Sequence, residues 1–142
     1  MEQSMRKFMK VGLILHVAYR GLGDGDGPIL ECLGKVVADD YFDAVEVARI
    51  NDPEVRRAAA GLIRTGHMVS AYGGQGRTLS AGLNRNDLDE GGRQKAVDTL
   101  KEGIDEAYEL GCVGFSFLSG RYREETKEQS LHQLIKSTRE LC

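Results

Sequence analysis

The sequence predicts an α/β fold in which four parallel strands are each followed by a helix, in the order (βα)4. Four short runs of strand-type residues alternate with four segments whose apolar residues recur at helical spacing. No two of these runs are joined by a two-residue turn, so the intervening segments serve as crossovers between parallel strands. The length of 142 residues suits one domain, and we expect a single domain over residues 1–142.

The predicted strands and helices follow one another along the whole chain. The strands are residues 10–16, 42–47, 67–72 and 113–118, each rich in β-branched, aromatic or other apolar side chains. Pro28 is expected to open the first helix, Asn51 or Asp52 to cap the second, and Gly66 and Gly111 to end the second and third. The apolar stripes of the four helices are Ile29, Leu33, Val36 and Val37; Val55, Ala58, Ala59, Leu62 and Ile63; Ala96, Val97, Leu100, Ile104 and Ala107; and Leu131, Leu134, Ile135, Thr138 and Leu141.

Two glycine-rich segments are predicted as loops at the strand ends. Residues 21–27 follow the first strand and are expected to form a flexible loop over the mouth of the fold. The spacing of glycines there departs from a dinucleotide fingerprint, because Asp26 stands where the third glycine is required. Residues 73–92 follow the third strand and are expected to form a long lid-like loop with glycine hinges.

Two parallel architectures accept this order, an open doubly wound sheet and half of a closed barrel. Alternate strand positions face opposite sides of a sheet, and one set here is bulky while the other is small or polar. One bulky face indicates helices on one side only, and therefore half of a (β/α)8 TIM barrel. The bulky set is Val11, Leu13, Leu15, Val45, Val47, Val113, Phe115 and Phe117; the other is Gly12, His16, Ala44, Glu46, Ser70, Gly114 and Ser116.

Four stretches of the chain resemble the sugar-phosphate isomerase/epimerase family: residues 42–47, 72–75, 101–111 and 117–120. The resemblance implies a xylose-isomerase-like TIM barrel, of which this chain corresponds to the N-terminal half. It also implies proton-shuttling isomerisation or epimerisation of a sugar or polyol, in which a divalent metal (Mn, Mg, Co or Zn) polarises the substrate oxygens. The family's metal ligands lie in the second half, so no metal site is predicted for this chain alone and no catalytic residue is assigned.

Substrate-binding residues are expected at the carboxyl ends of the strands, where barrel enzymes place their sites. Each of three residues also has a purely structural interpretation. His16 could be hydrogen-bonded to a neighbouring residue, Glu46 could form an ion pair with Arg49, and Arg121 could be a solvated loop residue. The residues expected to contact a sugar or sugar phosphate are His16, Glu46, Tyr72, Gln75, Ser119 and Arg121.

Composition and edge strands suggest the location and partners of the chain. A net charge of −3 gives no electrostatic footprint for nucleic acid, and no apolar run is long enough to span a membrane. Three widely spaced cysteines are typical of reduced thiols, and we expect a cytoplasmic protein.

Because a half-barrel has two exposed edges, we expect a homodimer or a complementing second-half chain. The alternative functions are a non-catalytic sugar-phosphate-binding or scaffold domain and an open-sheet nucleotide-binding module.

Overall fold

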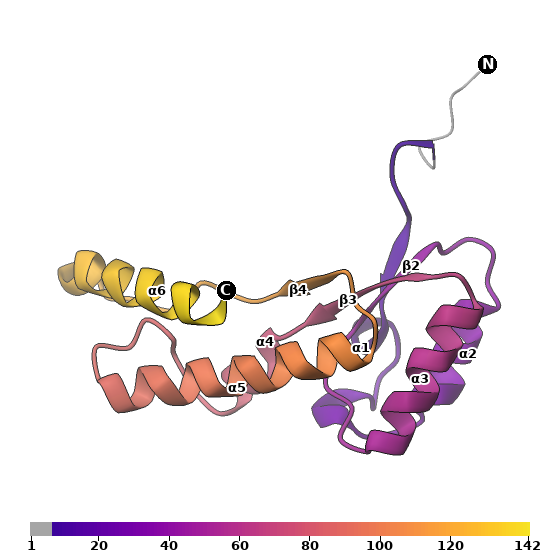
Figure 1. Cartoon of the computed structure of the whole chain (residues 1–142), viewed down its shortest axis with the longest axis horizontal. Helices are drawn as coiled ribbons and strands as arrows, with labels where there is room; N and C mark the ends of the chain where they lie inside the picture. Colours follow the sequence, from indigo (N-terminus) through magenta and orange to yellow (C-terminus); the bar gives the residue numbers. More distant parts are fainter. Residues whose placement is uncertain (1–6) are drawn as a thin grey trace.

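A computed structural model describes residues 7–142 as four parallel strands in the order β1-β2-β3-β4, with helices between them (Figure 1). The strands are β1 (Gly12–Ile14), β2 (Ala44–Val47), β3 (Val69–Gly73) and β4 (Gly114–Ser116). The α/β fold and the half-barrel order predicted from the sequence are therefore confirmed. Residues 1–6 of the predicted single domain lie outside the described part. The helices are α1 (Leu15–Ala18), η2 (Gly23–Gly25), α2 (Ile29–Val37), α3 (Pro53–Thr65), α4 (Gln75–Ser80), α5 (Glu90–Glu109), η3 (Glu124–Thr126) and α6 (Lys127–Leu141).

The long helices α2, α3 and α5 cover one face of the sheet and leave the other uncovered (Figure 1). Val45 and Val47 of β2 are each 1% exposed and pack with the helices in the hydrophobic core. Because parallel partners in register point to the same side, Leu13, paired with Val45, also faces the helices. The uncovered face carries small side chains, as predicted, including Ala44 and its partner Gly12.

Two members of the predicted faces are placed differently. Ser70 is predicted on the small inner face, but it pairs in register with Val45 and is 1% exposed on the helix side. This prediction is wrong because β3 keeps a polar residue beneath the helices, where the Ser70 hydroxyl lies 3.4 Å from the carbonyl oxygen of Gly111. Val113 is predicted to face the helices, but it precedes β4 and is 77% exposed.

Residues 73–92 do not form the long loop that the sequence predicts. They contain the short helix α4 and the first turn of α5, joined by residues 81–89. Asp89 caps α5 by accepting a hydrogen bond of 2.7 Å from the backbone N–H of Gly92, which offsets the poor helix propensity of Gly91 and Gly92. Gln75, predicted to begin a loop, is the first residue of α4.

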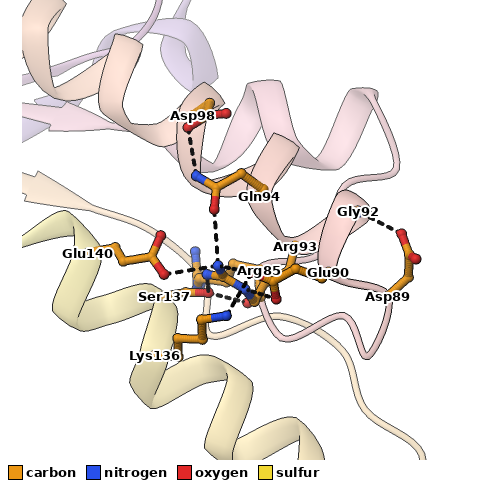
Figure 2. Close-up of polar contacts among 10 residues, drawn as sticks. All are labelled: Arg85, Asp89, Glu90, Gly92, Arg93, Gln94, Asp98, Lys136, Ser137 and Glu140. Atoms are coloured by element: carbon orange, nitrogen blue, oxygen red, sulfur yellow. Dashed lines mark hydrogen bonds and ion pairs between the residues drawn. The ribbon is translucent and has the colours of Figure 1, made fainter.

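A ring of polar contacts around Arg93 joins α5 to α6 (Figure 2). The Arg93 side chain is fully buried, and its Nη1 donates to the Ser137 hydroxyl at 2.9 Å. Its Nη2 lies 2.7 Å from Glu90 and 2.9 Å from Glu140. Ser137 in turn donates to the backbone carbonyl of Arg85 at 2.6 Å. This network holds α6, whose predicted apolar stripe is only partly covered: Leu131 is 53% exposed and Ile135 is 40% exposed, whereas Leu134, Thr138 and Leu141 are half-buried.

Large apolar side chains are exposed beside both edges of the four-stranded sheet. Near β1 they are Phe8, Met9, Ile14 and Val17, and near β4 they are Val113 and Leu118. In a closed barrel each of these edges pairs with a further strand, which removes both the unpaired backbone and the exposed apolar surface.

Within the part of the chain that the structure describes, no helix has the length and apolar character needed to cross a membrane.

Candidate functional site

A pocket of about 370 Å³ lies at the carboxyl ends of β1, β2 and β3. In a parallel sheet these ends meet at the same edge, so short segments that are distant in sequence converge there. The helix α4 and the middle of α5 complete its wall. The polar and aromatic side chains that line it include His16, Asp24, Arg49, Tyr72, Gln75 and Arg77.

His16 lines this pocket from a helical turn. The prediction that it ends the first strand is wrong, because β1 stops at Ile14 and residues 15–18 form α1. The turn forms because Leu15 is buried in the core and its carbonyl accepts from the backbone N–H of Tyr19. The Nδ1 atom of His16 is buried and has no hydrogen-bond partner among the described residues. A buried ring nitrogen without a partner is costly, so a ligand hydroxyl that bonds to it would be stabilised.

Glu46 lies on the uncovered face of the sheet, beside Gly73 at the end of β3. Its carboxylate is half-buried and forms no hydrogen bond or ion pair with any described residue. In particular, the ion pair with Arg49 that the sequence left open does not form. A Cβ at position 73 would lie 2.8 Å from Oε1 of Glu46, so the glycine leaves room for the carboxylate in its present position. Glu46 is therefore an unused acceptor facing what would be the barrel interior.

Tyr72 is among the residues that line the pocket, but its hydroxyl points to the helix layer. It donates a hydrogen bond of 2.7 Å to Glu106 of α5. Burial, together with this bond to a carboxylate, raises the pKa of the Tyr72 phenol well above its usual value. The ring stacks on Phe115 of β4 at 5.4 Å between centroids. The hydroxyl is thus occupied within the fold and is not free to bond to a ligand.

Glu106 also fixes the short helix α4 against α5. Its Oε1 lies 2.9 Å from Arg77 of α4 and 3.7 Å from Arg56 of α3. Arg77 makes a second ion pair of 3.0 Å with the exposed Glu102. Because Arg77 and Gln75 belong to the same short helix, this buried carboxylate positions the polar wall of the pocket that α4 presents.

The glycine-rich loop of residues 21–27 closes another side of the pocket. The side-chain amide of Asn51 donates a hydrogen bond of 2.7 Å to the carbonyl oxygen of Asp24. The backbone N–H of Asn51 donates a second hydrogen bond, of 2.9 Å, to the carbonyl oxygen of Gly25. Asp24 adopts a left-handed conformation (φ 59°) within η2. Asp24 and Arg49 both line the pocket. Neither residue is predicted as a site residue from the sequence, although Arg49 comes just after β2. Loop 21–27, predicted to be flexible, is held to the end of β2 by Asn51.

Ser119 and Arg121 are not among the residues that line this pocket. Both are exposed and lie in the segment after β4. Asn84 holds this segment through two hydrogen bonds to the backbone of Arg121. Its side-chain N–H donates to the Arg121 carbonyl oxygen at 2.9 Å, and its side-chain oxygen accepts from the Arg121 N–H at 3.1 Å. Arg121 instead lines a smaller neighbouring pocket. The six predicted residues thus divide: His16, Tyr72 and Gln75 meet at one pocket, Glu46 faces the uncovered side of the sheet, and Ser119 and Arg121 lie apart.

Residues 7–142 contain no group of three or more His, Cys, Asp or Glu side chains arranged to hold a metal ion. The buried Nδ1 of His16 and the half-buried carboxylate of Glu46 are each available to hydrogen-bond with a polar ligand.

The fold matches that of two solved structures over about half of their length. One is described as a D-tagatose 3-epimerase-like protein, with a TM-score of 0.72, 18% identity, and coverage of 94% of this chain and 47% of that chain. The other is an L-ribulose 3-epimerase, with a TM-score of 0.67, 16% identity, and coverage of 93% and 46%. No protein-family model matches the sequence, and no curated protein matches it. At these identities the likeness shows the fold, which is half of a TIM barrel of this kind.

Proposed function

We propose that this chain is one half of a sugar isomerase or epimerase-like barrel and that it binds the polyol part of a sugar at the pocket by His16. The observation that supports this most is the unpartnered, buried Nδ1 of His16 at the carboxyl edge of the sheet. Barrel enzymes bind their substrates at that edge. Two solved structures with this fold are described as a D-tagatose 3-epimerase-like protein and an L-ribulose 3-epimerase.

In this proposal the described half binds and orients the sugar, while the chemistry depends on the other half. His16 accepts or donates a hydrogen bond to a ring or chain hydroxyl, and the Glu46 carboxylate accepts from another at the interior face. The proton shuttle between adjacent carbons requires an acid and a base on opposite sides of the reacting carbon, and a divalent metal would polarise the oxygens there. We assign those groups to a complementing second-half chain; a barrel closed by a second copy of this chain repeats the same residues and is expected to bind the sugar without turnover.

We propose further that a second copy of the chain completes the barrel in solution. Both edge strands and their exposed apolar neighbours require cover, and two copies related by a twofold axis provide eight strands. A separate second-half chain would provide the same cover, and co-purification of such a chain would replace the dimer as the completed barrel.

The nucleotide-binding alternative is less compatible with the geometry. Its phosphate-binding loop would be residues 21–27, but Asp24 of that loop lines the pocket, where its charge opposes a phosphate. The helices also cover one face of the sheet rather than both. The non-catalytic alternative remains a distinct experimental outcome, since it predicts sugar binding without turnover even when a separate second-half chain completes the barrel.

Replacing His16 by alanine is expected to weaken the binding of D-tagatose about 3- to 10-fold, the effect of losing one hydrogen bond to an uncharged group. Binding is measured by titration calorimetry or by NMR shift changes at β1–β3. The control is His132→Ala, because His132 is exposed on α6. Equal affinity of the His16→Ala variant and the unmodified chain would contradict the assignment of the sugar to this pocket.

A further inference from the structure

A second, smaller pocket of about 110 Å³ lies beside the first, between α4, residues 82–85 and the segment after β4. Leu79 lines both pockets, so the two are neighbours at the same end of the fold. Two arginines, Arg85 and Arg121, line it, and no carboxylate is among its lining residues. The local charge is therefore positive in a chain whose net charge is negative.

Arg85 is a buried cation without a counter-ion among the described residues. The residue is only 4% exposed, and its Nε and Nη2 atoms have no hydrogen-bond partner within residues 7–142. The guanidinium carbon lies 4.1 Å from the centre of the Phe117 ring, which supports the cation by a cation–π contact but accepts no N–H hydrogen bond in the guanidinium plane. Burial lowers the pKa of Arg85 to about 10, in keeping with a charge that lacks a compensating anion.

Asn84 and Gly120, which also line this pocket, fix the position of Arg121. Asn84 exchanges two hydrogen bonds with the backbone of Arg121, so the position of that backbone is fixed while the side chain stays exposed. Gly120, just before it, has a positive φ of 92° and lies against Asn84 and Asn86, where a side chain would not fit. Arg121 forms no ion pair with any described residue.

We propose that Arg85 and Arg121 form a binding site for a tetrahedral oxyanion, and that its natural occupant is the phosphate group of a phosphorylated sugar whose polyol part lies in the first pocket. The second clause rests on the proposed function, whereas the first does not. Arginine pairs with phosphate through parallel N–H···O bonds, and Arg85 has two N–H-bearing nitrogens in one plane that are unpaired. A phosphate there would satisfy both and neutralise the buried charge.

The test measures inorganic phosphate binding to the full chain by titration calorimetry at low salt, with the Arg121→Gln and Arg85→Leu variants. Each variant is expected to weaken phosphate binding about 10- to 100-fold, as for the loss of a charge-assisted hydrogen bond. Arg57→Gln, at an exposed position on α3, is the control and is expected to bind phosphate normally. Because Arg121 is exposed, its variant keeps the test valid even if Arg85→Leu fails to fold.

Two further comparisons separate this proposal from the function proposed above. D-Tagatose binding should be unaffected by Arg121→Gln, while phosphate binding should be unaffected by His16→Ala. Absence of phosphate binding, or equal phosphate affinity in the arginine variants and the control, would overturn the oxyanion site and leave the sugar pocket intact. Phosphate binding without any sugar binding would confirm the oxyanion site and overturn its assignment to a sugar phosphate.

Discussion

Replacing Glu106 by alanine is expected to lower the free energy of unfolding by about 3–5 kcal/mol, the usual effect of removing one partner from a buried ionic cluster. The change leaves the buried Tyr72 hydroxyl without its acceptor and leaves Arg77 and Arg56 without their shared carboxylate. Because these contacts join β3, α4 and α3 to α5, the variant should also loosen the wall of the sugar pocket. Urea denaturation followed by circular dichroism measures the first effect, and D-tagatose affinity measures the second.

Glu102→Ala is the matched control for this prediction. Glu102 lies one helical turn before Glu106 on α5 and also pairs with Arg77, but its side chain is 69% exposed. An exposed ion pair contributes little to stability, so we expect a change within about 0.5 kcal/mol. Equal effects of the two substitutions would contradict the view that the buried carboxylate organises this side of the pocket.

Replacing Arg93 by methionine is expected to release α6 from α5, with a loss of about 2–3 kcal/mol in the free energy of unfolding. Arg93 is buried, and its hydrogen bonds to Ser137 and Glu140 join the two helices (Figure 2). The control is Lys95→Met, because Lys95 lies on the same helix and has no ion pair with the described residues of α6. Hydrogen exchange should show faster exchange of the α6 amides in the Arg93 variant and unchanged exchange in the control.

The same network gives α6 a defined response to acid. Hydrogen bonds from Arg93 and Lys136 lower the pKa of Glu90 to about 2 from an ordinary value of 4.5. Because the pKa is lowered in the folded chain, the interaction is fully present above pH 4.5 and is lost as the pH falls toward 2. The α6 amides should therefore lose protection over this interval in the unmodified chain. If the same pH dependence persisted in a Glu90→Gln variant, Glu90 would not be its cause.

The fold was predictable because its signals are local and agree with one another. Strand-type runs separated by capped helices indicate the parallel order, and alternation along β2 indicates which face the helices cover. The prediction failed for residues 73–92, where glycines favoured a loop. Those residues are helical because Arg77 pairs with Glu106 and because Asp89 caps α5, and the first of these contacts joins residues 29 positions apart. A contact at that separation leaves no periodic signal in the sequence.

The site was predictable in its location and only partly in its members. His16, Tyr72 and Gln75 reach one pocket because each closely follows or ends a parallel strand. Position after a strand does not reveal the direction of a side chain, and the Tyr72 hydroxyl points instead to Glu106. Arg85 had no sequence signal, because its burial against Phe117 depends on the packing of two segments that are far apart in the sequence.

The central claim is that this chain is half of a sugar-binding barrel whose uncovered face needs a second set of four strands. Sedimentation equilibrium of the purified 142-residue chain tests it most directly. We predict a mass twice the 15.6 kDa of one chain, because pairing of β1 with β4 of a second copy covers both edges. A monomer at micromolar concentration that unfolds cooperatively would contradict the claim, since the half-barrel would then be stable with its inner face and both edges exposed to water.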